Sequence, residues 1–128
     1  MEEFAALLKS YGLSEVTGDR YAGEWPREAF RRHGIAYKLA EQPRSQLYQD
    51  MLPLLNSQRI ALLDSPVLVS QICGLERRVA RGGRESIDHP PHGHDDLANA
   101  VAGLAGLCIR QWRSPVTVTP LRLLGRAR

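Results

Sequence analysis

The sequence has few cysteines, few lysines and no long hydrophobic run. Its two cysteines, Cys73 and Cys108, stand far apart without a CxxC partner, which argues against a disulfide framework. Both fall in helical patterns, where we expect them to be buried as small apolar side chains. No apolar run approaches the roughly 20 residues of a membrane span, and the N-terminus does not resemble a signal peptide. We therefore expect a cytoplasmic protein with no membrane partner.

The chain also lacks the GxxxxGK[ST] phosphate loop, so it is not an ATPase of that type. Its formal net charge of +3 is carried almost wholly by arginine, since Lys9 and Lys38 are the only lysines. This mild excess allows an acidic partner without requiring one. With 128 residues, 43% of them hydrophobic, the chain can form one domain with a core of ordinary size. Residues 113–128 are basic and lack an apolar period, which predicts a flexible tail, either solvated or in contact with nucleic acid.

Hydrophobic periodicity predicts helices that alternate with short strands. Helical patterns cover residues 2–11, 25–34, 45–55, 66–79 and 95–112, and strand-like segments cover 14–19, 35–39, 59–64 and 85–87. The connections are long enough for crossovers, which predicts an α/β fold with a mainly parallel sheet flanked by helices. In the last helix we expect Leu97, Val101, Leu104 and Cys108 to face the core. Asp64 is interpreted as a structural cap of the helix that follows it.

Carboxylates gather at one predicted strand end and at the start of the last helix. Ligands of parallel sheets bind at the carboxyl ends of strands, where Asp19 follows Gly18. Asp95 and Asp96 begin a helix whose dipole keeps a carboxylate ionised, as Mg²⁺ requires. The alternatives are that Asp19 is a turn residue bonded to its own backbone and that the acidic pair belongs to a polar capping loop.

Three histidines, His89, His92 and His94, raise zinc as an alternative. Pro90 and Pro91 stiffen this run, no cysteine is near, and the spacing matches no zinc pattern, so we favour a hard cation.

Arginines flank the glycine pair Gly82-Gly83. They can form a flexible basic loop that contacts phosphate, or simply a solvated surface. The arginines concerned are Arg77, Arg78, Arg81 and Arg84.

Three blocks follow one another in the order GDRYAGEW, LLDSPVLVSQICGLER and HDDLANA. In this order they resemble the carboxyl-terminal nuclease domain of a phage terminase large subunit, over roughly residues 2–107. The resemblance implies a ribonuclease H-like fold in which acidic residues hold Mg²⁺ or Mn²⁺. It implies Asp19, Asp95 and Asp96 as catalytic metal ligands, with His94 and Asn99 in supporting positions. Many members carry Asp at the position of Asn99.

The resemblance also implies a departure from the family. The first metal-binding Asp of the family lies on a strand that precedes the helix with which this chain begins. We therefore expect residues 1–112 to form the distal part of a nuclease domain, followed by the tail at 113–128. The complete domain would cut concatemeric double-stranded DNA by two-metal phosphodiester hydrolysis, and we expect weak or no cleavage by this chain alone.

Further partners follow from the same resemblance. They are the terminase ATPase domain, the small terminase subunit and the portal, in the cytoplasm of a bacterial host. An exposed sheet edge invites pairing with another chain, which predicts a homodimer. The alternatives are a non-catalytic packaging or portal-contacting module, which includes a prophage remnant, and another ribonuclease H-like nuclease such as a resolvase.

Overall fold

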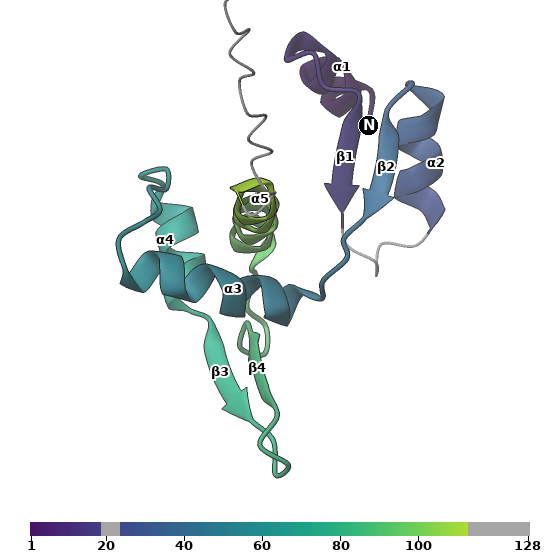
Figure 1. Cartoon of the computed structure of the whole chain (residues 1–128). Coiled ribbons are helices and arrows are strands. Elements are labelled where there is room, and N and C mark those ends of the chain that lie inside the picture. The colour runs from purple at the N-terminus through teal and green to yellow at the C-terminus, as the bar shows by residue number, and fades with distance from the viewer. Residues whose placement is uncertain (19–23, 113–128) are drawn as a thin grey trace, which may run out of the picture.

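The structure is a computed structural model that describes residues 1–18 and 24–112 (Figure 1). Its first half contains α1 (Glu2–Ser10), β1 (Glu15–Gly18), α2 (Glu24–Arg32) and β2 (Ala36–Leu39). β1 and β2 pair in parallel, with Glu15 opposite Ala36 and Gly18 opposite Leu39. The predicted strand–helix–strand order at the start of the chain is therefore confirmed, and Gly18 lies at the carboxyl end of its strand.

A tight turn and an aromatic contact join α2 to this sheet. Gly34 takes a φ of 72° just after the helix, a value that favours glycine, and lets the chain turn back into β2. Ile35 is then buried, with a relative exposure of only 1%. Phe30 of α2 stacks on Tyr37 of β2, with ring centroids 5.9 Å apart.

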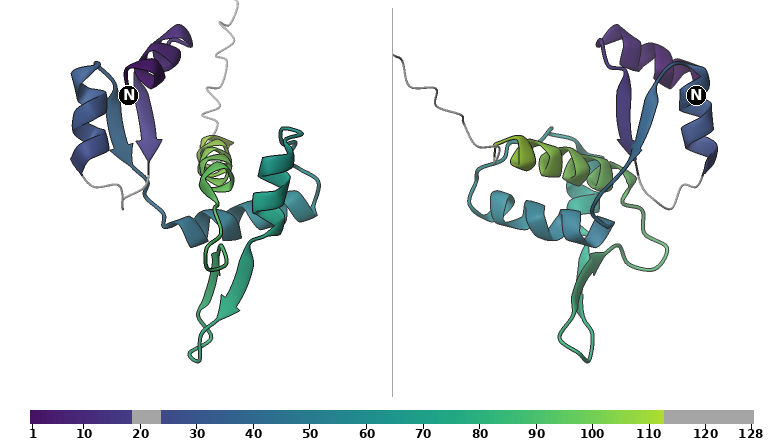
Figure 2. Two further views of the ribbon diagram at one scale, coloured as in Figure 1. Left: turned by 180° about the vertical axis from the view of Figure 1, so that it is seen from behind. Right: turned by 45° about the vertical axis from the view of Figure 1, so that its right-hand side comes forward.

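The second half is built around a helix pair, α3 (Arg44–Asn56) and α5 (Asp96–Trp112), with α4 (Pro66–Cys73) beside them. Figure 2 shows α5 lying along α3. The core between them comes from large side chains of α3 and small side chains of α5. Its buried members are Leu47, Tyr48, Met51, Ala98, Ala102 and Ala105.

The expected inward face of α5 was correct only for Val101, which packs against the core, and wrong for Leu97, Leu104 and Cys108. Ala98 and Ala102 are fully buried, whereas Leu104 is 62% exposed and Leu97 is 38% exposed. The alanines face α3 because only small side chains allow the two helix backbones to approach closely, and Gly106 lies next to Leu47 on the same side. Cys108, expected on the inward face, is exposed, and so is Cys73, so the predicted burial of both cysteines was also wrong.

A β-hairpin replaces part of one predicted helix. α4 ends at Cys73, with Gly74 as its C-cap, and β3 (Glu76–Val79) pairs antiparallel with β4 (Glu85–Asp88). The prediction of helix up to Val79 was wrong because the apolar spacing continues past Gly74 by coincidence. The hairpin turn at Gly82-Gly83 was predicted, and Gly83 takes a φ of 75°.

The predicted strand at 59–64 does not form in the part of the chain that the structure describes. Its residues join neither sheet, and Ile60 packs against the core. An apolar composition indicates burial, whereas a strand also needs a hydrogen-bonding neighbour. Ser65, rather than Asp64, is the N-cap of α4, because the Ser65 side chain accepts a hydrogen bond from the Leu68 N–H group.

The α/β class predicted from the sequence is confirmed, with one parallel and one antiparallel strand pair among the described residues. In Figures 1 and 2, the β1–β2 unit stands to one side of α5 and the β3–β4 hairpin projects away from the helices. None of the described helices is long and apolar enough to span a membrane.

Candidate functional site

A tight loop carries the chain from β4 into α5. The Gly93 N–H group donates to the Pro90 carbonyl oxygen at 2.9 Å, and His92 takes a φ of 63°. Proline at the second position and a positive φ at the third are typical of a type II turn. This turn lets Asp88 at the end of β4 lie near Asp95 at the start of α5.

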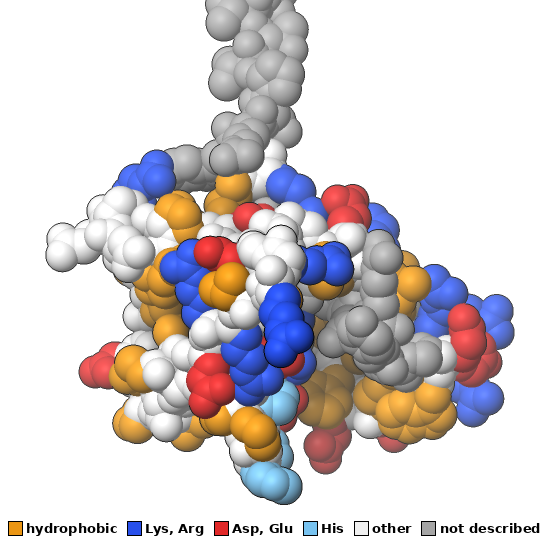
Figure 3. Space-filling view, turned by 90° about the horizontal axis from the view of Figure 1, so that it is seen from below, with side chains coloured by type: hydrophobic (Ala, Val, Ile, Leu, Met, Phe, Trp, Pro, Cys, Tyr) orange, Lys and Arg blue, Asp and Glu red, His pale blue; other side chains and the backbone are white. Residues whose placement is uncertain are grey.

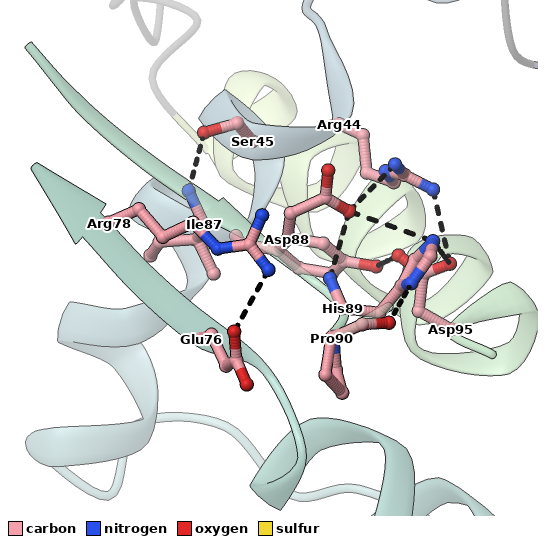
Figure 4. A network of polar contacts seen from close by, with 10 residues as sticks. Arg44, Ser45, Glu76, Arg78, Ile87, Asp88, His89, Pro90 and Asp95 are labelled. Atoms are coloured by element: carbon pink, nitrogen blue, oxygen red, sulfur yellow. Dashed lines mark hydrogen bonds and ion pairs between the residues drawn. The ribbon is translucent and has the colours of Figure 1, made fainter. Parts of the chain in front are cut away.

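Asp95 is the one buried residue with a charged side chain among the described residues, with 4% of its surface exposed. The Tyr48 hydroxyl donates to Asp95 Oδ2 at 2.7 Å. Arg44 Nη1 donates to Asp95 Oδ1 at 3.2 Å, as Figure 4 shows. Arg44 and Tyr48 are four residues apart on α3, so both side chains lie on the same face. Both carboxylate oxygens of Asp95 therefore have donors from α3, which satisfies a charge that burial would otherwise make costly.

The same guanidinium also binds the end of β4. Arg44 Nη2 donates to Asp88 Oδ1 at 2.7 Å, and the His89 backbone N–H donates to the same oxygen at 2.8 Å. His89 Nδ1 lies 2.8 Å from the Pro90 carbonyl oxygen. Because a carbonyl oxygen only accepts, this contact places a proton on Nδ1. We call Arg44, Tyr48, Asp88, His89 and Asp95 the Arg44 cluster.

Three members of the Arg44 cluster could serve as metal ligands. Asp88, His89 and Asp95 can each offer one ligand atom, and these atoms lie within 4.8 Å of one another. In the neutral His89 ring, Nε2 keeps its lone pair and lies 3.8 Å from Asp88 Oδ1. The donor atoms suit a cation, but the guanidinium of Arg44 already forms ion pairs with both carboxylates. A metal ion at this place would have to displace Arg44.

The pKa of the Tyr48 hydroxyl is shifted by its burial and by Asp95. Burial raises the pKa of its hydroxyl strongly, and the hydrogen bond to Asp95 and the negative charge of Asp95 raise the pKa further. The hydroxyl is therefore a lasting hydrogen-bond donor to Asp95 throughout the neutral range.

A groove of about 390 Å³ runs between α5 and the carboxyl end of β1. Gly18 at the end of β1 lies on one side of it, and Asp96 and Asn99 lie on the other. Asp96 is exposed, and its carboxylate has no ion pair among the described residues. We call this space the α5 groove. Its lining includes Val16, Gly18, Arg44, Asp96, Asn99 and Leu107.

Helix geometry separates the two neighbouring aspartates. Successive residues of an α-helix are rotated by about 100°. Asp95 lies one turn before Ala98 and shares the buried face, whereas Asp96 shares a face with Ala100, Gly103 and Leu107 and lines the α5 groove. The structure thus brings Asp96 and Asn99 together and turns Asp95 toward Arg44.

The N-terminus of α5 is capped from another helix. Gln71 Oε1 of α4 accepts from the Leu97 N–H at 2.9 Å and from the Ala98 N–H at 3.0 Å. This contact holds α4 and α5 together and leaves neither Asp95 nor Asp96 as the acceptor for these two groups.

The remaining predicted residues are placed as follows. His94 and His92 are exposed and do not join the possible ligand group, which contains only His89 of the three histidines considered for zinc. Asp19 lies outside the described residues. The basic positions Arg77, Arg78, Arg81 and Arg84 are all exposed on the β3–β4 hairpin.

Two of the hairpin arginines are neutralised locally. Arg77 pairs with Glu85, and Arg78 pairs with Glu76 at 2.9 Å. Arg81 and Arg84 flank the turn, and neither has an ion pair among the described residues. Figure 3, seen from the hairpin side, shows Lys and Arg side chains gathered over the middle of this face, interspersed with Asp and Glu.

Sequence reasoning missed Arg44, Tyr48 and Asp88. Arg44 contacts Asp95 across 51 positions of the sequence, and no local pattern reveals such a contact. A weak signal existed in the spacing of Arg44, Tyr48, Met51 and Leu55, which puts polar and apolar side chains on one face of α3. A polar pair at the end of an inward face indicates that a polar partner is buried opposite it.

The features described so far define a mixed α/β fold with acidic and amide side chains beside the end of a parallel strand. A solved structure with this fold is the large terminase nuclease from the thermophilic phage G20c. The two share 22% sequence identity with a TM-score of 0.65, and the match covers 79% of this chain and 56% of the nuclease chain. The chain therefore spans little more than half the length of that nuclease.

The sequence matches no protein-family model and no curated protein. The structural match nevertheless confirms the fold that the sequence resemblance implied, a ribonuclease H-like α/β fold shared with a terminase nuclease.

Proposed function

We propose that the chain is a metal-dependent nuclease component of a viral DNA-packaging terminase. Residues 1–112 form the distal part of its nuclease domain, and residues 113–128 form a basic tail. The observation that carries the proposal is the α5 groove, where Gly18, Asp96 and Asn99 meet in a fold shared with a terminase nuclease. Asp19 follows Gly18 directly in the sequence, so its carboxylate is the proposed ligand from the strand side.

Oxygen ligands at the α5 groove fit Mg²⁺ or Mn²⁺. Carboxylate and amide oxygens are the donors that these cations prefer. Asp19 supplies one carboxylate, the acidic pair Asp95–Asp96 at the start of α5 supplies the second, and Asn99 and His94 support them. When bound, two such ions activate a water molecule and stabilise the leaving oxygen of a phosphodiester.

Double-stranded DNA is the proposed substrate, contacted through its phosphates. Arg81 and Arg84 at the hairpin turn are the strongest candidates, because Arg77 and Arg78 share their charge with neighbouring glutamates. Because the net charge is only +3, we expect the contacts with DNA phosphates to be confined to this part of the surface rather than spread over the whole protein.

The proposed partners are those of a packaging complex in the cytoplasm of a bacterial host, namely the terminase ATPase domain, the small subunit and the portal. A second copy of the chain is proposed as a further partner. In residues 1–18 and 24–112, β1 pairs only with β2, so its other edge can accept a strand.

A non-catalytic packaging module is the second candidate function. The observation that favours it is Arg44, which occupies Asp88 and Asp95 and leaves fewer carboxylates for a cation. Metal binding separates the two candidates, because only the nuclease needs a site for Mn²⁺.

Titration calorimetry with Mn²⁺ tests the proposal. We expect the wild type to bind Mn²⁺ and the double variant Asp95→Ala/Asp96→Ala to lose binding. The matched control is Glu2→Ala/Glu3→Ala, which removes an acidic pair from the first turn of α1 and should bind as the wild type does. Absence of binding by the wild type would favour the non-catalytic module.

Plasmid incubated with the chain and Mn²⁺ gives the second readout. We expect weak or no nicking, because the site that the family uses contains a further aspartate from a preceding strand. Robust nicking that Asp19→Ala abolishes would show that this strand is dispensable.

A further inference from the structure

The acidic pair at the start of α5 divides into two unlike environments. Asp95 is 4% exposed and accepts hydrogen bonds from both Arg44 and Tyr48, whereas Asp96 is exposed and lines the α5 groove. Side by side in the sequence, the two carboxylates point to different sides of the helix. A single cation coordinated by oxygens at about 2.0–2.6 Å cannot use both equally while Asp95 keeps its present partners.

We propose that Asp95 is a positioning residue and that Asp96 is the cation ligand of this pair. The inference rests on the proposed function and assigns its roles. Arg44 and Tyr48 hold Asp95 from α3, and through Asp95 they fix the rotation of the first turn of α5. That rotation aims Asp96 and Asn99 into the α5 groove.

Contacts from Arg44 and from Gln71 hold this first turn in place. Arg44 bridges Asp95 to Asp88, so the start of α5 is tied to the end of β4 as well as to α3. Gln71 of α4 binds the Leu97 and Ala98 N–H groups from another side. Every buried side-chain nitrogen and oxygen among the described residues has a hydrogen-bond partner. The turn is therefore held by α3, α4 and β4 together, a support of the kind that orients ligands.

The negative charge of Asp95 already takes part in an ion pair inside the protein. Its carboxylate shares the guanidinium of Arg44 with Asp88, and displacement of that guanidinium by a metal ion would leave Arg44 without its two anionic partners. The carboxylate of Asp96 has no such competitor among the described residues. A cation therefore meets Asp96 without having to break an ion pair.

A comparison of isosteric and truncating substitutions tests the assignment. A ligand needs its negative charge, so Asp96→Asn should weaken Mn²⁺ binding by about tenfold or more. A positioning residue needs its shape and its contacts rather than its charge. Asn keeps the shape, its amide oxygen can accept from Arg44, and its amide group can donate to the Tyr48 hydroxyl oxygen, whereas Tyr48→Phe has no polar atom left for this contact. Asp95→Asn should therefore bind Mn²⁺ nearly as the wild type does, while Asp95→Ala should weaken binding by about tenfold or more. Calorimetry on the whole chain gives the affinities, and circular dichroism shows that each variant is folded.

Tyr48→Phe gives an independent measurement if Asp95→Ala fails to fold. It keeps the ring in the core and removes only the donor to Asp95 Oδ2. We expect weaker Mn²⁺ binding although Asp96 is unchanged.

The outcomes separate this inference from the proposed function. If Asp95→Asn binds Mn²⁺ as poorly as Asp96→Asn, Asp95 is itself a ligand and the assignment is wrong. If Asp95→Ala and Tyr48→Phe both bind as the wild type does, no positioning is needed and the assignment is again wrong. If the wild type binds Mn²⁺ but Asp96→Asn has no effect, Asp96 is not the ligand and only the assignment is wrong. If the wild type binds no Mn²⁺, the proposed function fails and the assignment fails with it.

Discussion

Tyr48 is a buried core residue that also contacts a carboxylate of the candidate site. Its hydroxyl points into the core between α3 and α5 and donates to a buried carboxylate. A tyrosine in this position cannot ionise without placing a second negative charge beside Asp95. The hydroxyl therefore stays protonated as long as the core is intact.

The raised pKa of Tyr48 gives a prediction at alkaline pH. In the unfolded chain a tyrosine ionises near pH 10, whereas in the folded chain the pKa of Tyr48 lies above that value. Its contribution to stability is present below about pH 10 and is lost as the pH rises further. We expect Tyr48→Phe to cost about 1–3 kcal/mol at neutral pH. This difference should shrink above about pH 10.

Thermal unfolding of both proteins from neutral to alkaline pH measures this difference. Tyr11→Phe is the matched control, because Tyr11 is 75% exposed and should leave stability unchanged at every pH. A constant difference between wild type and Tyr48→Phe across the range would contradict the burial of the hydroxyl.

The acidic residues show how far single positions can be predicted. The sequence placed Asp95 and Asp96 at the start of a helix, and the structure has both there. The different environments of the two aspartates could also have been predicted, because the stripe of Ala98, Ala102 and Ala105 marks the close-packed face that begins at Asp95. The contact of Asp95 with Arg44 could not have been predicted, because Arg44 belongs to a helix far away in the sequence.

At the scale of elements, α5 carries two apolar faces. One face has alanines and the other has leucines, so periodicity alone does not decide which faces the core. The leucines were predicted inside because they are larger. The alanines are inside because α3 already supplies the bulk through Leu47, Tyr48 and Met51. The orientation of α5 therefore depends on how its side chains fit those of α3 in size. This fit can be judged only when both helices are known to be neighbours.

Two glycines of α5 test this packing. A Cβ at Gly106 would lie 3.3 Å from Leu47, whereas a Cβ at Gly103 would lie 4.0 Å from the same side chain. We expect Gly106→Leu to destabilise the protein by about 1–3 kcal/mol through overpacking. Gly103→Ala should stabilise it by up to about 1 kcal/mol, because alanine is the better helix former.

Denaturant unfolding of the two variants beside the wild type gives both values. An unchanged midpoint for Gly106→Leu would mean that α5 does not approach α3 as closely as described.

The strands were predicted with mixed success for a related reason. β1, β2 and β4 were located from local patterns, whereas β3 was assigned to a helix and 59–64 to a strand. A strand depends on its neighbour, and the neighbour of β3 is β4, which lies beyond a glycine turn. Gly74 at the end of α4 was the local signal that separated helix from hairpin.

At the scale of the whole molecule, the β3–β4 hairpin extends away from the helices (Figure 1). Arg81 and Arg84 lie beside the turn without ion pairs among the described residues. A projecting basic tip can reach a DNA backbone while the α5 groove stays with the body of the molecule.

The salt dependence of DNA binding tests this arrangement. We expect Arg81→Ala/Arg84→Ala to weaken binding to duplexes of any sequence. The slope of log affinity against log salt should become shallower by about 0.9 for each phosphate that the variant no longer neutralises. Fluorescence anisotropy at several salt concentrations provides both quantities.

The matched control removes the same charge elsewhere. Arg31→Ala/Arg32→Ala lies on α2, where both arginines pair with Glu28. An equal drop in affinity in both double variants would show that net charge, rather than the hairpin tip, attracts the DNA.

The cap that Gln71 provides has a consequence for any phosphate that enters the α5 groove. The first turn of a helix usually offers free N–H groups to an anion. Here those of Leu97 and Ala98 are already taken by the Gln71 amide oxygen. Two of the N–H groups that this helix end could offer to an oxyanion are thus occupied, so we expect a nucleic-acid strand to be held there mainly by cations and side chains rather than by the peptide backbone.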